Sequence, residues 1–141
     1  MLVDGQPRQQ SPYRQFSANY EHGDDVVAKV QRILDSDYKQ PLRQSALAKQ
    51  VGVSDRTLLR RFRRATGYAP SQYLQAIRLE RARELLETTN DSLQRITDRV
   101  GYEDVSSFRR LFKQSTGLSP AEYRKRFRHS SDASRGRLAV S

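Results

Sequence analysis

Cysteine is absent from this 141-residue sequence. The chain therefore has no disulfide, no thiolate metal site and no cysteine nucleophile, which fits a reducing compartment. No apolar run approaches the ~18 residues of a membrane-spanning helix. The first ten residues, MLVDGQPRQQ, lack the apolar stretch of a secretory signal. We therefore expect a cytoplasmic protein that does not contact a membrane.

Acidic residues are also scarce relative to basic ones. The chain has 26 Lys and Arg against 16 Asp and Glu, a formal net charge of +10. This excess favours nucleic acid or another anionic surface as the partner, although charge alone also fits a basic soluble protein with no such partner. Only 35% of the residues are hydrophobic, which predicts a small core in one modest globular unit or in two subdomains that share a helix.

The chain carries the same pattern twice. Residues 47–73, LAKQVGVSDRTLLRRFRRATGYAPSQY, return as residues 96–123, ITDRVGYEDVSSFRRLFKQSTGLSPAEY, with one residue inserted. Both copies keep a Val-Gly pair, a phenylalanine, a Thr-Gly pair, a proline and a tyrosine at matching places. Two copies of one small helical unit indicate a protein that binds a long, regular, negatively charged partner at two places.

Apolar residues at helical spacing predict an all-α fold of about seven helices. No segment shows the alternation of a strand over a useful length. Ser54 and Asp104 are the expected N-caps of the second helix of each copy, and Gly67 and Gly117 the expected stops. The expected helices cover approximately residues 24–38, 43–51, 55–66, 71–88, 93–100, 105–116 and 120–127.

These helices divide the chain into two similar subdomains with flanking segments. Residues 1–22 are polar, contain two prolines and show no helical period, and the last residues are mostly Ser, Arg and small residues. We predict a lead-in arm or interdomain linker (1–23), a first helix-turn-helix subdomain (24–70), a linking helix (71–88), a second helix-turn-helix subdomain (89–128) and a disordered basic tail (129–141).

Each copy has the features of a helix-turn-helix motif. Such a motif needs a small residue where its helices approach, a turn residue that tolerates positive φ, and apolar positions that fix the angle. Ala48 and Gly52 meet the first two needs in the first copy, and Thr97 and Gly101 in the second. One copy alone fits a plain helical hairpin equally well. Two copies in register, each followed by TG-x-x-P-x-x-Y, favour the helix-turn-helix interpretation.

The second helix of each copy has an outward face suited to nucleic acid. The helical period predicts that Leu58 and Phe62 face inward in the first copy, as do Phe108 and Phe112 in the second. The stretch 56–64 contains five arginines and no acid, whereas a merely solvated face usually interleaves the two. Arginine can donate to guanine N7 and O6 or to phosphate. The outward residues are Arg56, Leu59, Arg60 and Arg63 in the first copy, and Val105, Ser106, Arg109, Arg110 and Lys113 in the second.

Over about residues 24–127 the chain resembles the AraC/XylS family of bacterial transcription regulators. The resemblance is carried by SDRTL at 54–58, by GYEDVSSFRRLFK at 101–113 and by TGLSPAEYR at 116–124. It implies an all-helical domain in which one long helix joins two helix-turn-helix subdomains, each sending its second helix into a major groove. It also implies promoter binding and activation through contact with RNA polymerase. We expect the two recognition helices to be about one DNA turn, roughly 34 Å, apart.

The resemblance places base-reading residues on the outward face already identified: Arg56, Leu59, Arg60, Val105, Ser106, Arg109 and Arg110. Leu59 and Val105 can make only apolar contacts, for instance with a thymine methyl. Arg61, Arg63 and Lys113 are predicted phosphate contacts, and the stem of Arg61 should lie on the core. The copies differ, so we expect an asymmetric DNA site and not a palindrome. The lead-in also resembles the junction in regulators that carry an amidotransferase-like domain upstream, which would put the effector domain outside this chain.

Enzymatic interpretations find little support in the sequence. It has no Gly-rich phosphate loop, and the similar two-unit domains of some DNA-repair methyltransferases belong to enzymes that need a cysteine. We expect no metal or cofactor, and we expect His22 and His129 to be exposed to solvent. Glutamates on the linking helix should form surface pairs with neighbouring arginines: Glu80, Glu84 and Glu87 with Arg81 and Arg83.

Three hypotheses therefore remain. The first is a sequence-specific regulator that binds double-stranded DNA at the nucleoid. The second is a nonspecific nucleic-acid module. The third is a helical module whose arginines bind an acidic protein.

Overall fold

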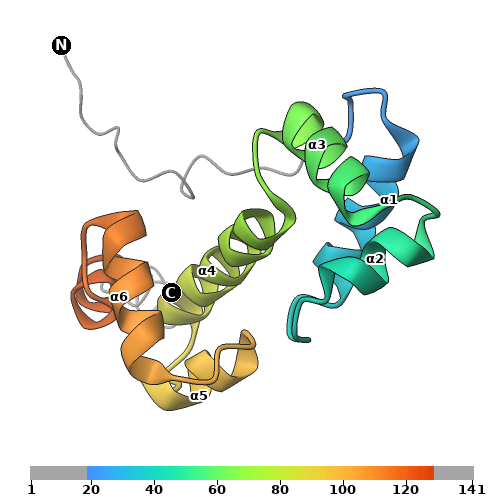
Figure 1. Cartoon of the computed structure of the whole chain (residues 1–141). Helices are drawn as coiled ribbons and strands as arrows, with labels where there is room; N and C mark the ends of the chain where they lie inside the picture. The colour runs from blue at the N-terminus through green and yellow to red at the C-terminus, as the bar shows by residue number, and fades with distance from the viewer. Residues whose placement is uncertain (1–18, 129–141) are drawn as a thin grey trace, which may run out of the picture. The chain divides into compact units, whose positions relative to one another are not determined.

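The computed structural model describes residues 19–128, which contain seven helical segments and no strand (Figure 1). The all-α prediction is confirmed. The expected tail and most of the expected lead-in lie outside the described residues. None of the described helices has the length and apolar character that a bilayer span requires. The helices are α1 (Asp25–Ser36), α2 (Gln44–Gln50), α3 (Asp55–Thr66), α4 (Pro70–Thr88), α5 (Leu93–Arg99), α6 (Val105–Thr116) and a final helical segment over residues 120–128.

The described chain forms two compact units whose boundary lies inside α4, between Arg78 and Leu79. The first unit contains α1, α2, α3 and the beginning of α4. The second contains the rest of α4, α5, α6 and the final helical segment. The longest helix of the described chain therefore contributes to both units.

The helices α3 and α6 begin and end where the sequence predicts. The Ser54 hydroxyl accepts a hydrogen bond from the Thr57 backbone N–H at 3.1 Å, and the Asp104 carboxylate accepts from the N–H groups of Ser106 and Ser107. These side chains satisfy N–H groups that have no partner within the helix. At the other end, Gly67 and Gly117 both adopt φ of 82° and close α3 and α6.

Replacing either glycine by alanine should destabilise its unit by about 1 kcal/mol, because a left-handed backbone is unfavourable for residues with a Cβ. A Cβ at Gly67 or Gly117 would meet nothing within 4 Å, so backbone strain is the only expected contribution. The measurement is the free energy of unfolding in denaturant. Gly67→Asn is the matched control, since asparagine tolerates this conformation better. Equal losses for alanine and asparagine would contradict the explanation.

Each unit is built around an aromatic pair that the repeat places equivalently. In the first unit, Phe62 and Tyr73 pack edge to face with ring centroids 5.2 Å apart. In the second unit, Phe112 and Tyr123 do the same at 5.4 Å. All four side chains are buried. The paired Phe and Tyr of the repeat are therefore core residues.

The structural repeat is longer than the sequence repeat. The buried residues of α1 share their spacing with those of the second half of α4, although the two segments have little sequence in common. The matching buried positions are Val27, Val30 and Leu34 in α1, and Leu79, Ala82 and Leu86 in α4. The second half of α4 thus supplies the buried face of the first helix in the second unit, as α1 does in the first unit.

The buried tyrosine of each unit meets a polar side chain from this first helix. In the first unit the partner is Gln31, a fully buried side chain that donates to the Tyr73 hydroxyl at 3.1 Å and to the Asn19 carbonyl at 3.0 Å. Burial raises the pKa of Tyr73 to about 12. A neutral amide therefore joins α1, α4 and residue 19.

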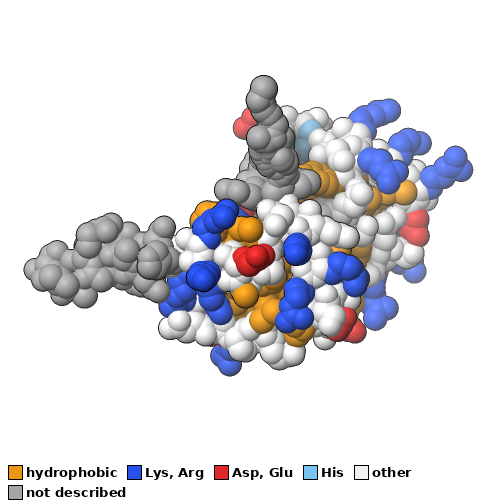
Figure 2. Space-filling view, turned by 90° about the vertical axis from the view of Figure 1, so that its left-hand side faces the viewer, with side chains coloured by type: hydrophobic (Ala, Val, Ile, Leu, Met, Phe, Trp, Pro, Cys, Tyr) orange, Lys and Arg blue, Asp and Glu red, His pale blue; other side chains and the backbone are white. Residues whose placement is uncertain are grey.

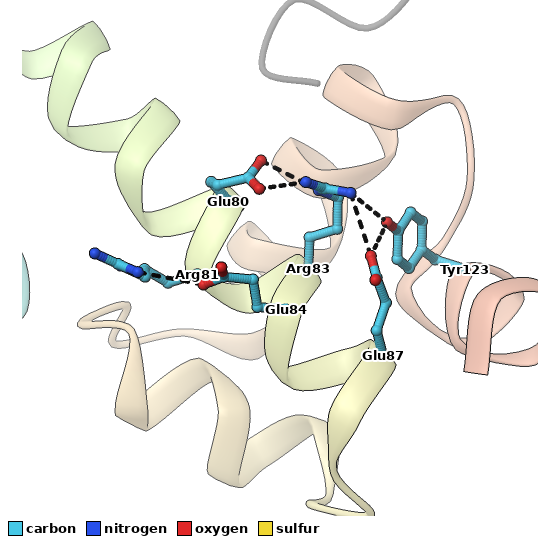
Figure 3. A network of polar contacts seen from close by, with 6 residues as sticks. All are labelled: Glu80, Arg81, Arg83, Glu84, Glu87 and Tyr123. Atoms are coloured by element: carbon cyan, nitrogen blue, oxygen red, sulfur yellow. Dashed lines mark hydrogen bonds and ion pairs between the residues drawn. The ribbon is translucent and has the colours of Figure 1, made fainter. Parts of the chain in front are cut away.

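In the second unit the corresponding contact is charged (Figure 3). Arg83 donates to the Tyr123 hydroxyl at 3.1 Å and forms ion pairs with Glu80 and Glu87. The Tyr123 hydroxyl donates in turn to Glu87 at 2.5 Å. The expected glutamate–arginine pairs on α4 are confirmed, but the sequence did not predict that Tyr123 would join them.

Candidate nucleic-acid interface

The helix α3 has an apolar face on one side and a cationic face on the other. Leu58 and Phe62 are fully buried, whereas Arg56, Arg60 and Arg63 are exposed. The remaining predicted reader, Leu59, is half-buried. The inward and outward assignments for this helix therefore agree with the structure.

The helix α6 repeats the arrangement with fewer charges. Phe108 and Phe112 are buried, and Val105 is half-buried at the start of the helix. The other four predicted contact residues of α6 are exposed, and all of them line an open hollow along its outer face together with Gln114: Ser106, Arg109, Arg110 and Lys113.

The turn before each of these helices holds it against its partner. In the first unit the Val53 N–H donates to the Ala48 carbonyl at 3.0 Å, and Gly52 has φ of 77°. In the second unit the Tyr102 N–H donates to the Thr97 carbonyl at 3.1 Å. Four residues separate α2 from α3 (51–54) and five separate α5 from α6 (100–104), so the inserted residue of the second copy lies in this turn.

Basic side chains dominate the surface over acidic ones on the face that Figure 2 shows. Some of the cations outside α3 and α6 are already paired. Asp91, for instance, accepts from Arg99 at 2.6 Å and lies 3.6 Å from Arg95. No ion pair involves the predicted contact residues Arg56, Arg60, Arg63, Arg109, Arg110 or Lys113 within residues 19–128. The outer faces of α3 and α6 can therefore offer their positive charge to a ligand.

Arg61 differs from its neighbours on α3. It is partly buried, as expected, but its guanidinium is held by the Asp24 carboxylate, with Nε 2.9 Å from Oδ2 and Nη2 2.7 Å from Oδ1. Hydrogen bonding to Arg61 lowers the pKa of Asp24. This contact could not be predicted from the sequence, because 37 residues separate its partners.

The expectation that His22 is exposed was wrong. His22 is half-buried; its Nδ1 accepts from the Asp24 N–H at 3.1 Å, and its Nε2 lies 2.7 Å from the Gln31 side-chain oxygen. The His22 ring therefore helps to fix the backbone of the residues that precede α1. His129 lies outside the described residues, which contain no group of three or more acidic or histidine side chains placed to hold a metal ion.

The comparisons with known proteins agree with this geometry. Residues 47–126 match the family model described as "Helix-turn-helix domain". The Msm operon regulatory protein of Streptococcus mutans is 33% identical over 99 residues, which are 70% of this chain and 36% of that protein. The chain spans about a third of the length of that protein and of two further curated relatives from Bacillus subtilis and Mycobacterium tuberculosis.

Two solved structures show the same fold. One is the DNA-binding domain of AdpA, a global transcriptional factor, in complex with a target DNA. It is 34% identical with a TM-score of 0.71, over 76% of this chain and 96% of that one. The other is a transcriptional regulator with an AraC-type DNA-binding domain from Chromobacterium violaceum. It is 30% identical with a TM-score of 0.66, over 71% of this chain and 89% of that one.

The repeated helix-turn-helix, the matched family model and these structural neighbours together confirm the resemblance found in the sequence. The chain belongs to the AraC/XylS family of helix-turn-helix transcription regulators.

Proposed function

We propose that this chain binds double-stranded DNA sequence-specifically and regulates transcription, without catalysing a reaction. The helices α3 and α6 enter successive major grooves of an asymmetric promoter site. The observation that carries the proposal is the pair of equivalent cationic helices, each fixed by a buried aromatic core and a helix-turn-helix turn. A helix of this kind fits the major groove. Residues 24–70 and 89–128 are the two reading parts, with 71–88 as their link.

The proposed contacts divide into two classes. Arginine and serine can hydrogen-bond to base edges, whereas Leu59 and Val105 offer apolar contact to a thymine methyl. The proposed base readers are Arg56, Leu59, Arg60, Val105, Ser106, Arg109 and Arg110. Cations at the sides of the helices would instead contact the phosphates and fix the register on the DNA backbone, and these are Arg61, Arg63 and Lys113.

The decisive experiment selects bound duplexes from a random library and measures their affinity by gel shift over a salt series. A sequence-specific regulator should keep a preference of at least ~10³ for the selected site over random DNA. Equal affinity for all duplexes at every salt concentration would favour the nonspecific module. Failure to bind any duplex at moderate salt would favour an acidic protein partner.

Lys113→Ala should weaken binding to all sequences about equally and reduce the slope of log affinity against log salt by about 0.9. Lys113 is exposed near the end of α6, and an ammonium that neutralises one phosphate releases about one counterion. The measurement is the same salt series with the selected and a random duplex. Lys125→Ala, an exposed lysine of the final helical segment, is the matched control. A loss confined to the selected duplex would show that Lys113 reads bases.

The regulatory output is proposed from the family resemblance. Members of the AraC/XylS family typically activate transcription by contacting RNA polymerase, and we extend this activity to the protein that contains this chain. We propose that it acts in the cytoplasm, at the nucleoid. In vitro transcription from a promoter that carries the selected site would test it, since an activator raises the initiation rate and a repressor lowers it.

A further inference from the structure

We propose that Asp24 is a positioning residue of the first DNA-reading helix, α3, and that it acts through the guanidinium of Arg61. Through this contact residues 19–24, which include the described end of the lead-in, become part of the first reader and influence the first half-site alone. The inference rests on the proposed function and names residues outside α3 on which recognition at that site depends.

One carboxylate joins two helices of the first unit. Both of its oxygens accept from Arg61 in the middle of α3, in the two-bond geometry that fixes a guanidinium most firmly. Oδ1 also accepts from the Val27 N–H and caps the start of α1. The side chains are 19% exposed for Asp24 and 34% for Arg61, so the pair is less screened by solvent than a fully exposed pair.

The contact lies beside the proposed base readers. Arg61 follows Arg60 directly, and both belong to the same turn of α3 as Leu59. An arginine has five N–H donors, and Asp24 engages two of them. The others remain for a phosphate, so Asp24 can hold the guanidinium ready for the backbone while it fixes the rotation of α3. Preorganisation of this kind reduces the ordering that binding requires.

The same segment is anchored at a second point. The Asp24 N–H donates to His22 Nδ1, so the ring hydrogen lies on Nε2 and is donated to the Gln31 side-chain oxygen. Gln31 in turn donates to the Asn19 carbonyl and to the Tyr73 hydroxyl. Residues 19–24 are therefore tied to α1 and to the beginning of α4 as well as to α3, and a displacement of this segment would reach the recognition helix through Asp24.

Among residues 19–128, the second unit has no equivalent of this contact. The residue that corresponds to Arg61 is Leu111, which has no charge. The first helix of the second unit is the continuation of α4, whose position is set by covalent continuity and which needs no cap there. A change at Asp24 should therefore affect one half-site and leave the other unchanged.

The test is Asp24→Ser, because serine is an equally good N-cap for α1 but cannot form the two bonds to Arg61. Removing a negative charge from a DNA-binding surface should by simple electrostatics strengthen binding to every duplex. If Asp24 positions α3, the substitution should instead weaken recognition of the first half-site. We expect the preference for the selected duplex over a derivative with the first half scrambled to fall about 3- to 10-fold. The preference over a derivative with the second half scrambled should not change.

A double-mutant cycle with Arg61→Leu shows whether Asp24 acts through Arg61. In the Arg61→Leu background, Asp24→Ser should have no further effect on the first-half preference. Hydrogen exchange of the free protein adds a measurement that does not involve DNA: Asp24→Ser should speed exchange in α3 and not in α6.

Tighter binding of Asp24→Ser to all duplexes, an equal loss at both halves, or unchanged exchange in α3 would overturn the inference. These results differ from a failure of the proposed function, in which the unsubstituted protein itself would show no preference for any selected duplex.

Discussion

Replacing Phe112 by alanine is expected to destabilise the second unit by about 3–5 kcal/mol while the first unit stays folded. Phe112 is fully buried and packs its ring against Tyr123 at 5.4 Å and against Phe108 at 5.7 Å. Removal of the ring takes apolar surface out of the core and leaves a cavity that the neighbouring aromatic rings can fill only partly. A loss of this size is comparable with the whole stability of a small domain.

Hydrogen exchange during denaturant unfolding would measure this effect helix by helix. Protection should be lost early in α5 and α6 and retained in α2 and α3, because the two units have separate cores. Phe62→Ala should produce the reverse pattern, and Arg109→Ala, an exposed site on α6, should change stability by at most about 0.5 kcal/mol. A single transition in which Phe112→Ala weakens both units equally would show that they fold as one cooperative body.

The sequence could predict the helices because their signals are local. A cap residue such as Ser54 or Asp104 lies within three residues of the N–H group that it satisfies, and Gly67 stops α3 through its own backbone conformation. The buried face of each recognition helix follows from a 3.6-residue period. Such signals span only a few residues, so they predict a helix without any knowledge of what the helix packs against.

Contacts between distant parts of the first unit were not predictable in this way. The Asp24–Arg61 pair has no spacing rule, and the same is true of the Gln31–Tyr73 hydrogen bond, whose partners are 42 residues apart. His22 was misjudged for the same reason, because its partner Gln31 is buried by a helix that the local pattern does not locate. The match between α1 and the second half of α4 was hidden because those segments share burial and spacing but few residues.

The two copies of the repeat differ in the polar contacts of their buried tyrosines, Tyr73 and Tyr123. A neutral glutamine holds Tyr73 in the first unit, whereas an arginine with two glutamates surrounds Tyr123 in the second. The recognition helices are unequal as well, since α3 has more exposed arginines and α6 offers Ser106 and Val105. Two units with different supports and different readers should recognise two different half-sites in a fixed orientation.

Arg60→Ala and Arg110→Ala should each weaken binding to the selected duplex by about 1–3 kcal/mol and relax the base preference at one position. The two residues occupy the same place on α3 and α6 and are exposed, with no ion pair to an acid among the described residues. An arginine there can donate two parallel hydrogen bonds to guanine N7 and O6, and no other base pair offers that pattern in the major groove. Loss of the side chain therefore removes discrimination as well as charge.

Selection from a random library, repeated with each variant, measures both parts of this prediction. Arg60→Ala should broaden preference in one half-site and Arg110→Ala in the other, while Arg63→Ala, a proposed phosphate contact two turns from the start of α3, should lower affinity without altering the selected sequence. The positions that broaden would also show how the two half-sites are oriented relative to the chain. A uniform loss of affinity across all duplexes for Arg60→Ala or Arg110→Ala would reassign that arginine to the phosphate backbone, and base recognition in that half-site would then have to come from its neighbours, Arg56 and Leu59 on α3 or Ser106 and Arg109 on α6.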